Sequence, residues 1–147
     1  MLSKKAKYAI KALLALAEND GEEPMRIADL ARAHQIPPKF LELILLVLKN
    51  QGILQSRKGK GGGYLLARNP SEIFLGQIVR MFDGPLAPVP CASQTAYVRC
   101  LDCRNEAVCG VRLAMKEVRD VTARVLDGTS LASLCRKVQR ASASSSP

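Results

Sequence analysis

Residues 36–67 have the sequence IPPKFLELILLVLKNQGILQSRKGKGGGYLLA. Pro38 suits the first turn of a helix, because that turn does not need its backbone N–H, and the apolar run after it predicts a helix to about Gln51. Two short apolar segments, 53–56 and 64–67, flank a basic, glycine-rich segment and predict two strands joined by a turn. The stretch therefore predicts a helix followed directly by a β-hairpin.

Two further helices are predicted upstream. Residues 3–18 carry apolar side chains at spacings of three and four, which is typical of an amphipathic helix. A second, shorter helix is predicted to begin at Pro24, and a tight connection at residues 34–38 leads into the next helix. A helix-turn-helix followed by a hairpin is a winged arrangement. The expected fold class is mainly α with a small β-hairpin wing, and residues 1–84 are the predicted winged helix-turn-helix DNA-binding domain.

The basic turn of the hairpin suits contacts with phosphate groups. Its cations can reach a DNA backbone, and its glycines let backbone amides approach closely. A solvated hairpin tip without a partner is the alternative. A nucleotide-binding loop would need the pattern G-x-x-x-x-G-K-[ST] opening a helix, whereas Tyr64 and a strand follow the glycines here. We therefore expect a wing that contacts DNA.

The composition also favours a polyanionic partner. The chain of 147 residues has 22 Lys and Arg against 13 Asp and Glu, a formal net charge of +9. Nucleic acid and an anionic membrane surface are both compatible with this charge, as is a basic protein without a special partner. No apolar run approaches the ~18–20 residues of a membrane span, and the first residues do not resemble a signal peptide, so we expect a cytoplasmic protein with no membrane partner. The single histidine, His34, has no catalytic partners, and we expect no enzyme.

Four cysteines follow the predicted domain with the spacing C-x8-C-x2-C-x5-C, and they are Cys91, Cys100, Cys103 and Cys109. Residues 85–110 contain several prolines and are predicted to be an irregular loop. Such a loop can hold disulfides or a metal. Because thiols stay reduced in the cytosol, metal binding or redox chemistry is favoured. A fifth cysteine, Cys135, lies apart and is expected to be a small buried apolar residue.

A long amphipathic helix is predicted from residue 111 to residue 127. Its apolar stripe consists of Val111, Ala114, Met115, Val118, Val121, Thr122 and Val125. The stripe can pack on its own domain or on the same helix of a second copy, and we favour a homodimer because winged regulators bind paired half-sites. Residues 111–138 are therefore the predicted dimerisation helix and a short C-terminal helix, and residues 139–147 are predicted to be a disordered tail.

Several motifs together resemble the Rrf2 family of bacterial winged-helix regulators, which includes IscR, NsrR and CymR. They are Lys7-Tyr8-Ala9, Ile27-Ala28-Asp29-Leu30-Ala31, Ile36-Pro37-Pro38-Lys39-Phe40-Leu41-Glu42, Gly61-Gly62-Gly63-Tyr64-Leu65-Leu66-Ala67, Gly84-Pro85-Leu86 and the cysteine loop. The resemblance implies a dimeric DNA-binding regulator. In many members an iron–sulfur cluster in this loop reports iron, cluster supply, oxidants or nitric oxide, whereas members similar to CymR lack the cysteines and act through protein partners.

The resemblance also assigns DNA contacts. Glu42 matches a base-reading glutamate, whose carboxylate can accept a hydrogen bond from cytosine N4, and Lys58 matches a wing cation. The expected DNA-binding residues are Lys39, Glu42, Arg57, Lys58, Lys60, Gly61, Gly62 and Tyr64. The chain departs from the family at Leu43, Leu46 and Val47, where polar residues are frequent.

The cysteine pattern departs from the family as well. IscR-like members have a histidine ligand where this chain has Arg112, which cannot bind iron. NsrR-like members take an acidic ligand from the first helix, where this chain offers Lys7 and Tyr8. Cys100 is an additional cysteine and would complete four thiolates from one chain. Four thiolates suit a [2Fe–2S] cluster, a [4Fe–4S] cluster or structural zinc.

These features predict a homodimeric transcriptional regulator that binds double-stranded DNA. Its cysteine loop is expected to sense iron–sulfur cluster status, redox state or nitric oxide. The alternative is a winged-helix protein-interaction module that regulates a partner enzyme and uses zinc only to hold the loop together.

Overall fold

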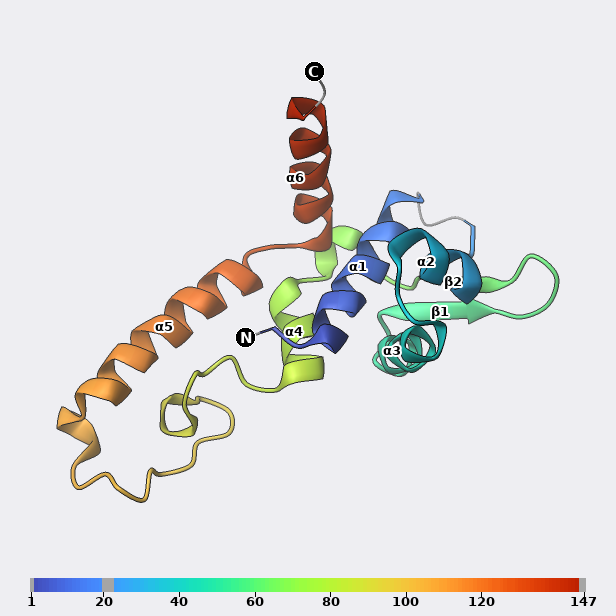
Figure 1. Cartoon of the computed structure of the whole chain (residues 1–147). Helices are drawn as coiled ribbons and strands as arrows, with labels where there is room; N and C mark the ends of the chain where they lie inside the picture. Colours follow the sequence, from blue (N-terminus) through green and yellow to red (C-terminus); the bar gives the residue numbers. More distant parts are fainter. Residues whose placement is uncertain (1, 20–22, 146–147) are drawn as a thin grey trace.

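Helices dominate the computed structural model, which describes residues 2–19 and 23–145 (Figure 1). The main elements are α1 (Lys4–Glu18), α2 (Ile27–His34), α3 (Pro38–Asn50), β1 (Leu54–Arg57), β2 (Gly63–Leu66), α4 (Leu75–Asp83), α5 (Gly110–Asp127) and α6 (Leu131–Ser144). Short 3₁₀ turns are η1 (Pro70–Glu72), η2 (Pro90–Ala92) and η3 (Glu106–Val108). The predicted fold class, mainly α with a small β-hairpin wing, is confirmed.

Helix α1 lies at the centre of the folded body. Its buried side is rich in alanine, including Ala9 and Ala12, which are fully inaccessible to solvent. Small side chains let α3, α4 and α6 approach this helix closely, and all three contact it. Just before its first residue, Ser3 accepts a hydrogen bond from the Ala6 N–H and donates its own backbone N–H to Asp83 at 3.0 Å. The N-cap of α1 is thereby joined to the end of α4.

The turn between α2 and α3 is tight because one residue adopts a left-handed conformation. Gln35 has φ of 53°, and its N–H caps α2 by bonding to the Ala31 carbonyl. Ile36, directly after it, is buried in the core. Helix α3 then begins at Pro38, as predicted. Its inner stripe is Leu41, Ile44, Leu45 and Leu48.

The hairpin follows directly, with β1 and β2 antiparallel and Leu54 opposite Leu66. A third segment joins it, because Met25 and Tyr64 exchange both backbone hydrogen bonds at 2.8 Å. The expectation that α2 begins at Pro24 is therefore wrong. The backbone of Met25 extends the hairpin instead, and α2 starts at Ile27.

Helix α5 projects from the folded body, and α6 begins against that body and then extends away from it (Figure 1). Two backbone hydrogen bonds hold the start of α6 against the folded body. Leu131 donates its N–H to the Ile73 carbonyl at 2.7 Å, and Leu75 donates its N–H to the Thr129 carbonyl at 3.0 Å. The Leu131 side chain is fully buried in the core. Helix α6 thus packs on α1 and η1, so the C-terminal segment is part of the winged body as well as the continuation of α5.

The predicted disordered tail is wrong as far as Ser144, because α6 continues to that residue. Alanine has the highest helix propensity, and alanines alternate with the serines at the end of this helix. The last two residues, 146–147, lie outside the described part. Among the described helices, none combines the length and the apolar character that crossing a bilayer requires.

Candidate nucleic-acid interface and cysteine cavity

The outward face of α3 carries the residues expected to read bases. Lys39 and Glu42 are exposed on the side of the helix opposite its buried stripe, and Lys49 is exposed near its C-terminus. Between these polar groups lie two exposed leucines, Leu43 and Leu46. The face therefore offers few hydrogen-bonding groups and a sizeable apolar surface.

The wing holds its cations away from the core. Arg57 ends β1, while Lys58 and Lys60 lie in the exposed loop between the strands. The loop extends outward from the folded body, away from its helices (Figure 1). Cations presented in this way can reach phosphates on either side of a groove.

Close backbone contacts explain why glycines stand at the base of the wing. A Cβ at Gly62 would lie 2.3 Å from the Arg57 carbonyl oxygen, and a Cβ at Gly63 would lie 2.3 Å from the Met25 carbonyl oxygen. Tyr64 is half-buried, packs against the core and pairs with Met25 through its backbone. Gly62 and Tyr64 therefore shape the hairpin, whatever contacts they make with a partner.

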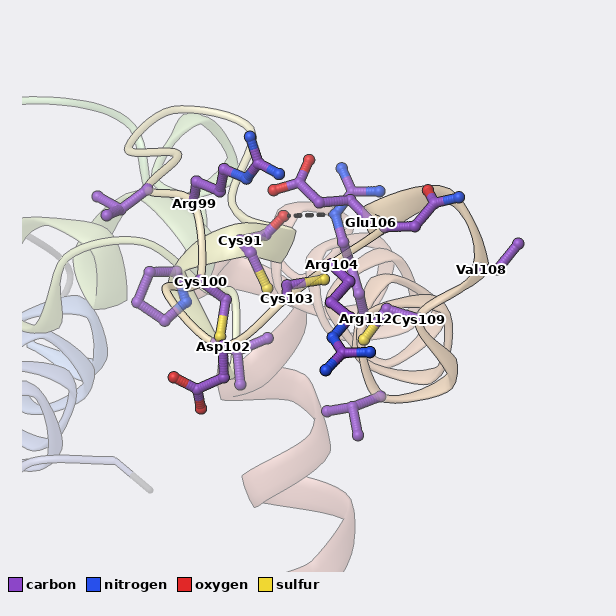
Figure 2. Close-up of a pocket in the computed structure, with 15 residues that line it drawn as sticks. Cys91, Arg99, Cys100, Asp102, Cys103, Arg104, Glu106, Val108, Cys109 and Arg112 are labelled. Carbon is purple, nitrogen blue, oxygen red and sulfur yellow. Dashed lines mark hydrogen bonds between the residues drawn. The ribbon is translucent and has the colours of Figure 1, made fainter.

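All four loop cysteines line one cavity of about 770 Å³ between the loop and the N-terminal turn of α5 (Figure 2). Cys91 lies in η2, Cys109 is the N-cap of α5, and Cys103 ends a turn in which its N–H bonds to the Cys100 carbonyl at 3.3 Å. Cys100 is exposed and the other three are half-buried. Apolar side chains such as Val98, Val108 and Val111 complete the walls.

Arginine side chains from α5 hold one end of the loop. Arg112 donates from Nε to the Cys91 carbonyl at 2.9 Å, as the dashed line in Figure 2 marks, and Arg119 donates to the Ala92 carbonyl. Within the loop the Tyr97 hydroxyl donates to the Glu106 carboxylate. Arg112 thus positions the backbone of a cysteine. These contacts have no sequence signature, because each joins residues that are distant in the chain or in an irregular loop.

The chemistry of the cavity is that of a thiol cluster. All five cysteines of the chain are among the described residues, and each is a free thiol, so the disulfide alternative is absent here. Desolvation and the neighbouring thiols Cys109 and Cys100 raise the pKa of Cys103. In residues 2–19 and 23–145 no three His, Cys, Asp or Glu side chains stand in metal-binding geometry. The donor types fit an iron–sulfur cluster or zinc, and the loop would have to close to bring the sulfurs together.

Cys135 lies outside this cavity, on α6. Burial, followed by the charge of Glu18, raises the pKa of its thiol. Cys135 is half-buried, whereas a buried residue is expected from the sequence.

Helix α5 has no buried residue and leaves its apolar stripe exposed. Val111, Val118, Val121 and Val125 are between 46% and 66% exposed. Near its C-terminus Asp127 forms a bidentate pair with Arg80 of α4, at 2.6 and 2.9 Å. The helix is therefore attached to the winged body at one end and to the cysteine loop at the other.

Comparison with known proteins agrees with this architecture. Residues 2–137 match the Rrf2 family, which is described as an iron-dependent transcriptional regulator. An HTH-type, rrf2-like transcriptional regulator of Rhodobacter capsulatus is 42% identical over 121 residues, covering 80% of this chain and 81% of the relative. NsrR of Geobacillus kaustophilus is 34% identical over 133 residues, covering 90% of this chain and 88% of NsrR.

Solved structures give the same result. CymR, the global cysteine regulator of B. subtilis, superposes with a TM-score of 0.77 at 29% identity, over 93% of this chain and 97% of CymR. IscR of T. potens superposes with a TM-score of 0.74 at 26% identity, over 96% of this chain and 90% of IscR. These relatives are transcriptional regulators, so the expectation that the chain is not an enzyme is confirmed. The chain belongs to the Rrf2 family of winged-helix transcriptional regulators, as the resemblance of its motifs predicts.

Proposed function

We propose that the protein is a homodimeric DNA-binding regulator whose cysteine loop carries the signal to the DNA-binding surface. The observation that supports this most directly is the position of the loop. Its four thiols line one cavity, and the same loop is the covalent connection between α4 of the winged body and α5. A change in the loop is therefore well placed to alter how two winged domains are held relative to each other.

In this proposal α3 enters the major groove and the wing contacts the backbone. Glu42 and Lys39 face the bases, while Arg57, Lys58 and Lys60 neutralise phosphates. Each phosphate contact releases counterions, so affinity for duplex DNA falls steeply with salt. Fluorescence anisotropy with a labelled duplex at several salt concentrations measures this slope. An affinity that does not change with salt would contradict DNA binding through this surface.

The exposed stripe of α5 supports the homodimer. Val111, Val118 and Val125 are spaced by seven residues, and Ala114 and Val121 repeat at the same interval between them. This is the a and d pattern of a two-helix seam, and an exposed seam of this kind is expected to be covered by the same helix of a second copy.

A charge in the seam tests the dimer. Val118→Glu should shift the protein to a monomer in analytical ultracentrifugation, because a buried unpaired carboxylate is costly. Leu113 is exposed on the same helix but lies on another face, and Leu113→Glu is the matched control. Equal dissociation in both variants, or in neither, would contradict the proposed seam.

Cys91, Cys100, Cys103 and Cys109 would hold an iron–sulfur cluster, of the [2Fe–2S] or [4Fe–4S] type. Such a group supplies a centre that responds to electrons, oxidants or nitric oxide. Residues of the chain itself would pass a change in this group on to α5, because Arg112 and Arg119 bind the backbone of η2 to that helix. A coupling of ~1–3 kcal/mol between loop and DNA surface would change DNA affinity by about 5- to 150-fold.

The first experiment is anaerobic purification followed by a visible absorption spectrum and counts of iron, sulfide and zinc. Iron and sulfide with charge-transfer bands support the proposal. Single Cys→Ser variants of the four loop cysteines should lose the group and change DNA affinity, whereas Cys135→Ser, on α6, should do neither. Retention of full iron and of the wild-type response in the Cys91, Cys103 and Cys109 variants would refute it.

The alternative is a protein-interaction module with a structural zinc. The apolar surface on the outward face of α3 favours it, because such surfaces are frequent at protein interfaces. Zinc without iron in the purified protein, together with weak DNA affinity that does not depend on salt, would support this alternative.

A further inference from the structure

The outward face of α3 is unusual for a recognition helix because its centre is apolar. Leu43 is 61% exposed, Leu46 is 46% exposed and Val47 is 37% exposed. The buried stripe of the same helix is complete without them. These side chains therefore do not serve the core, and in the folded chain they lie against water.

Their place on the helix is defined by the 100° step between residues. Lys39, Leu43, Leu46 and Asn50 follow one another at steps of four, three and four, so they form a single line along the exposed face. Glu42 lies on one edge of this line and Val47 on the other. The two leucines consequently form the middle of the exposed face of α3.

The charges around this apolar line indicate which surface that is. Lys39 and Lys49 are exposed on α3, and the exposed wing cations Arg57, Lys58 and Lys60 follow in the chain. The chain as a whole carries a formal charge of +9. A protein partner that matched the apolar line would also have to match these cations, whereas a DNA groove satisfies both, with phosphates at its rims and apolar methyl groups in its floor.

We propose that Leu43, Leu46 and Val47 recognise thymine by burying its C5-methyl groups in the major groove. The C5-methyl is the one apolar group that the major groove presents, and it distinguishes thymine from the other three bases. The operator half-site is then expected to contain thymines beside the cytosine that Glu42 is placed to read. This inference rests on the proposed entry of α3 into the major groove and specifies what it reads there.

Deoxyuridine gives a direct test, because it lacks only the methyl group and keeps every hydrogen-bonding group of thymine. The purified dimer first selects a consensus duplex from a random library, and single thymines of that duplex are then replaced by deoxyuridine. Loss of one contacted methyl should weaken binding about three- to fivefold, the effect of exposing one buried carbon group. Because the contact is uncharged, the slope of affinity against salt should not change.

Protein variants assign the effect to the helix. Leu43→Asn and Leu46→Ser, both at exposed positions, should each lose the discrimination between thymine and deoxyuridine at the thymine that the replaced side chain contacts. Val138→Thr, which changes an exposed apolar residue on α6, should keep the wild-type discrimination. Circular dichroism and thermal unfolding establish that the variants are folded.

The outcomes separate this inference from the proposed function. Salt-dependent binding of a consensus in which deoxyuridine changes nothing, or in which Leu43→Asn keeps full discrimination, would overturn thymine recognition and leave DNA binding intact. A lack of salt-dependent binding to any duplex would overturn both. It would also indicate that the apolar line docks on a protein.

Discussion

Replacing Gly63 by alanine should destabilise the protein and loosen the wing. Gly63 has φ of +152°, and a Cβ there would lie 2.3 Å from the Met25 carbonyl oxygen and 2.5 Å from its carbon. Both atoms belong to the backbone, so the clash cannot be relieved by rotating a side chain. The segment around Met25 must therefore move away from β2 at the point where Met25 and Tyr64 exchange hydrogen bonds.

The magnitude follows from two contributions. Holding alanine at a positive φ costs about 1–3 kcal/mol. Loss of the two hydrogen bonds between Met25 and Tyr64 costs about 1 kcal/mol each. Gly63→Ala should therefore lower the free energy of unfolding by about 3–5 kcal/mol. Gly61 provides a matched control, because its φ is also positive, +79°, but no atom lies within 4 Å of its Cβ position. Gly61→Ala should cost only the backbone contribution, about 1 kcal/mol.

Urea unfolding followed by circular dichroism measures both variants. The protein concentration has to be the same in all samples, since the stability of a dimer depends on concentration. Equal losses for Gly61→Ala and Gly63→Ala would refute the reasoning, because the close approach of Met25 would then have no energetic consequence. In DNA binding, Gly63→Ala should also weaken affinity more than Gly61→Ala.

Three further predictions concern single contacts. Asp127→Asn breaks the pair with Arg80, and because both side chains are about half exposed the loss should stay below about 1 kcal/mol. The hydrogen bond from Arg80 lowers the pKa of the Asp127 carboxyl in the folded protein. The stabilisation by the pair is therefore present at neutral pH. It is lost as the pH falls from the ordinary carboxyl pKa of about 4 through the lowered pKa of the folded state. Stability curves of wild type and Asp127→Asn should converge there, and curves that diverge in acid would contradict it. Lys58→Ala should reduce the salt slope of DNA affinity by about 1, and an unchanged slope would exclude a phosphate contact. Ser3→Ala removes the hydroxyl that caps α1 and donates to the Asp83 carboxylate, while the backbone bond to Asp83 remains. It should cost about 1–2 kcal/mol in urea unfolding, where no loss would contradict the capping role.

The winged domain was predictable because its signals are local. The proline pair before α3, the spacing of three and four between its buried residues and the glycine-rich turn each act within a few residues. The start of α2 was not predictable, because pairing of Met25 with Tyr64 joins residues far apart in the chain. That long-range pairing overrides the tendency of Pro24 to begin a helix.

Of the cysteine loop, only the set of candidate metal ligands was predictable. Spacing identified four thiols that line one cavity, but it could not predict which side chains hold the loop. The contact of Arg112 with the Cys91 carbonyl depends on how an irregular segment folds back on α5. The burial of Leu131 depends likewise on the return of α6 to the body. Both are tertiary contacts without a periodic pattern in the sequence.

The attachments of α5 suggest where a signal from the loop would act. Its C-terminal end is fixed to the winged body by the Arg80–Asp127 pair and by the burial of Leu131 just beyond it. Its N-terminal end contacts the loop, through Cys109 and Arg112. A rearrangement of the loop should therefore move the N-terminal half of α5 more than its C-terminal half. In a dimer built on the α5 seam, such a movement would change the angle between the two helices, and with it the spacing of the two α3 helices on DNA.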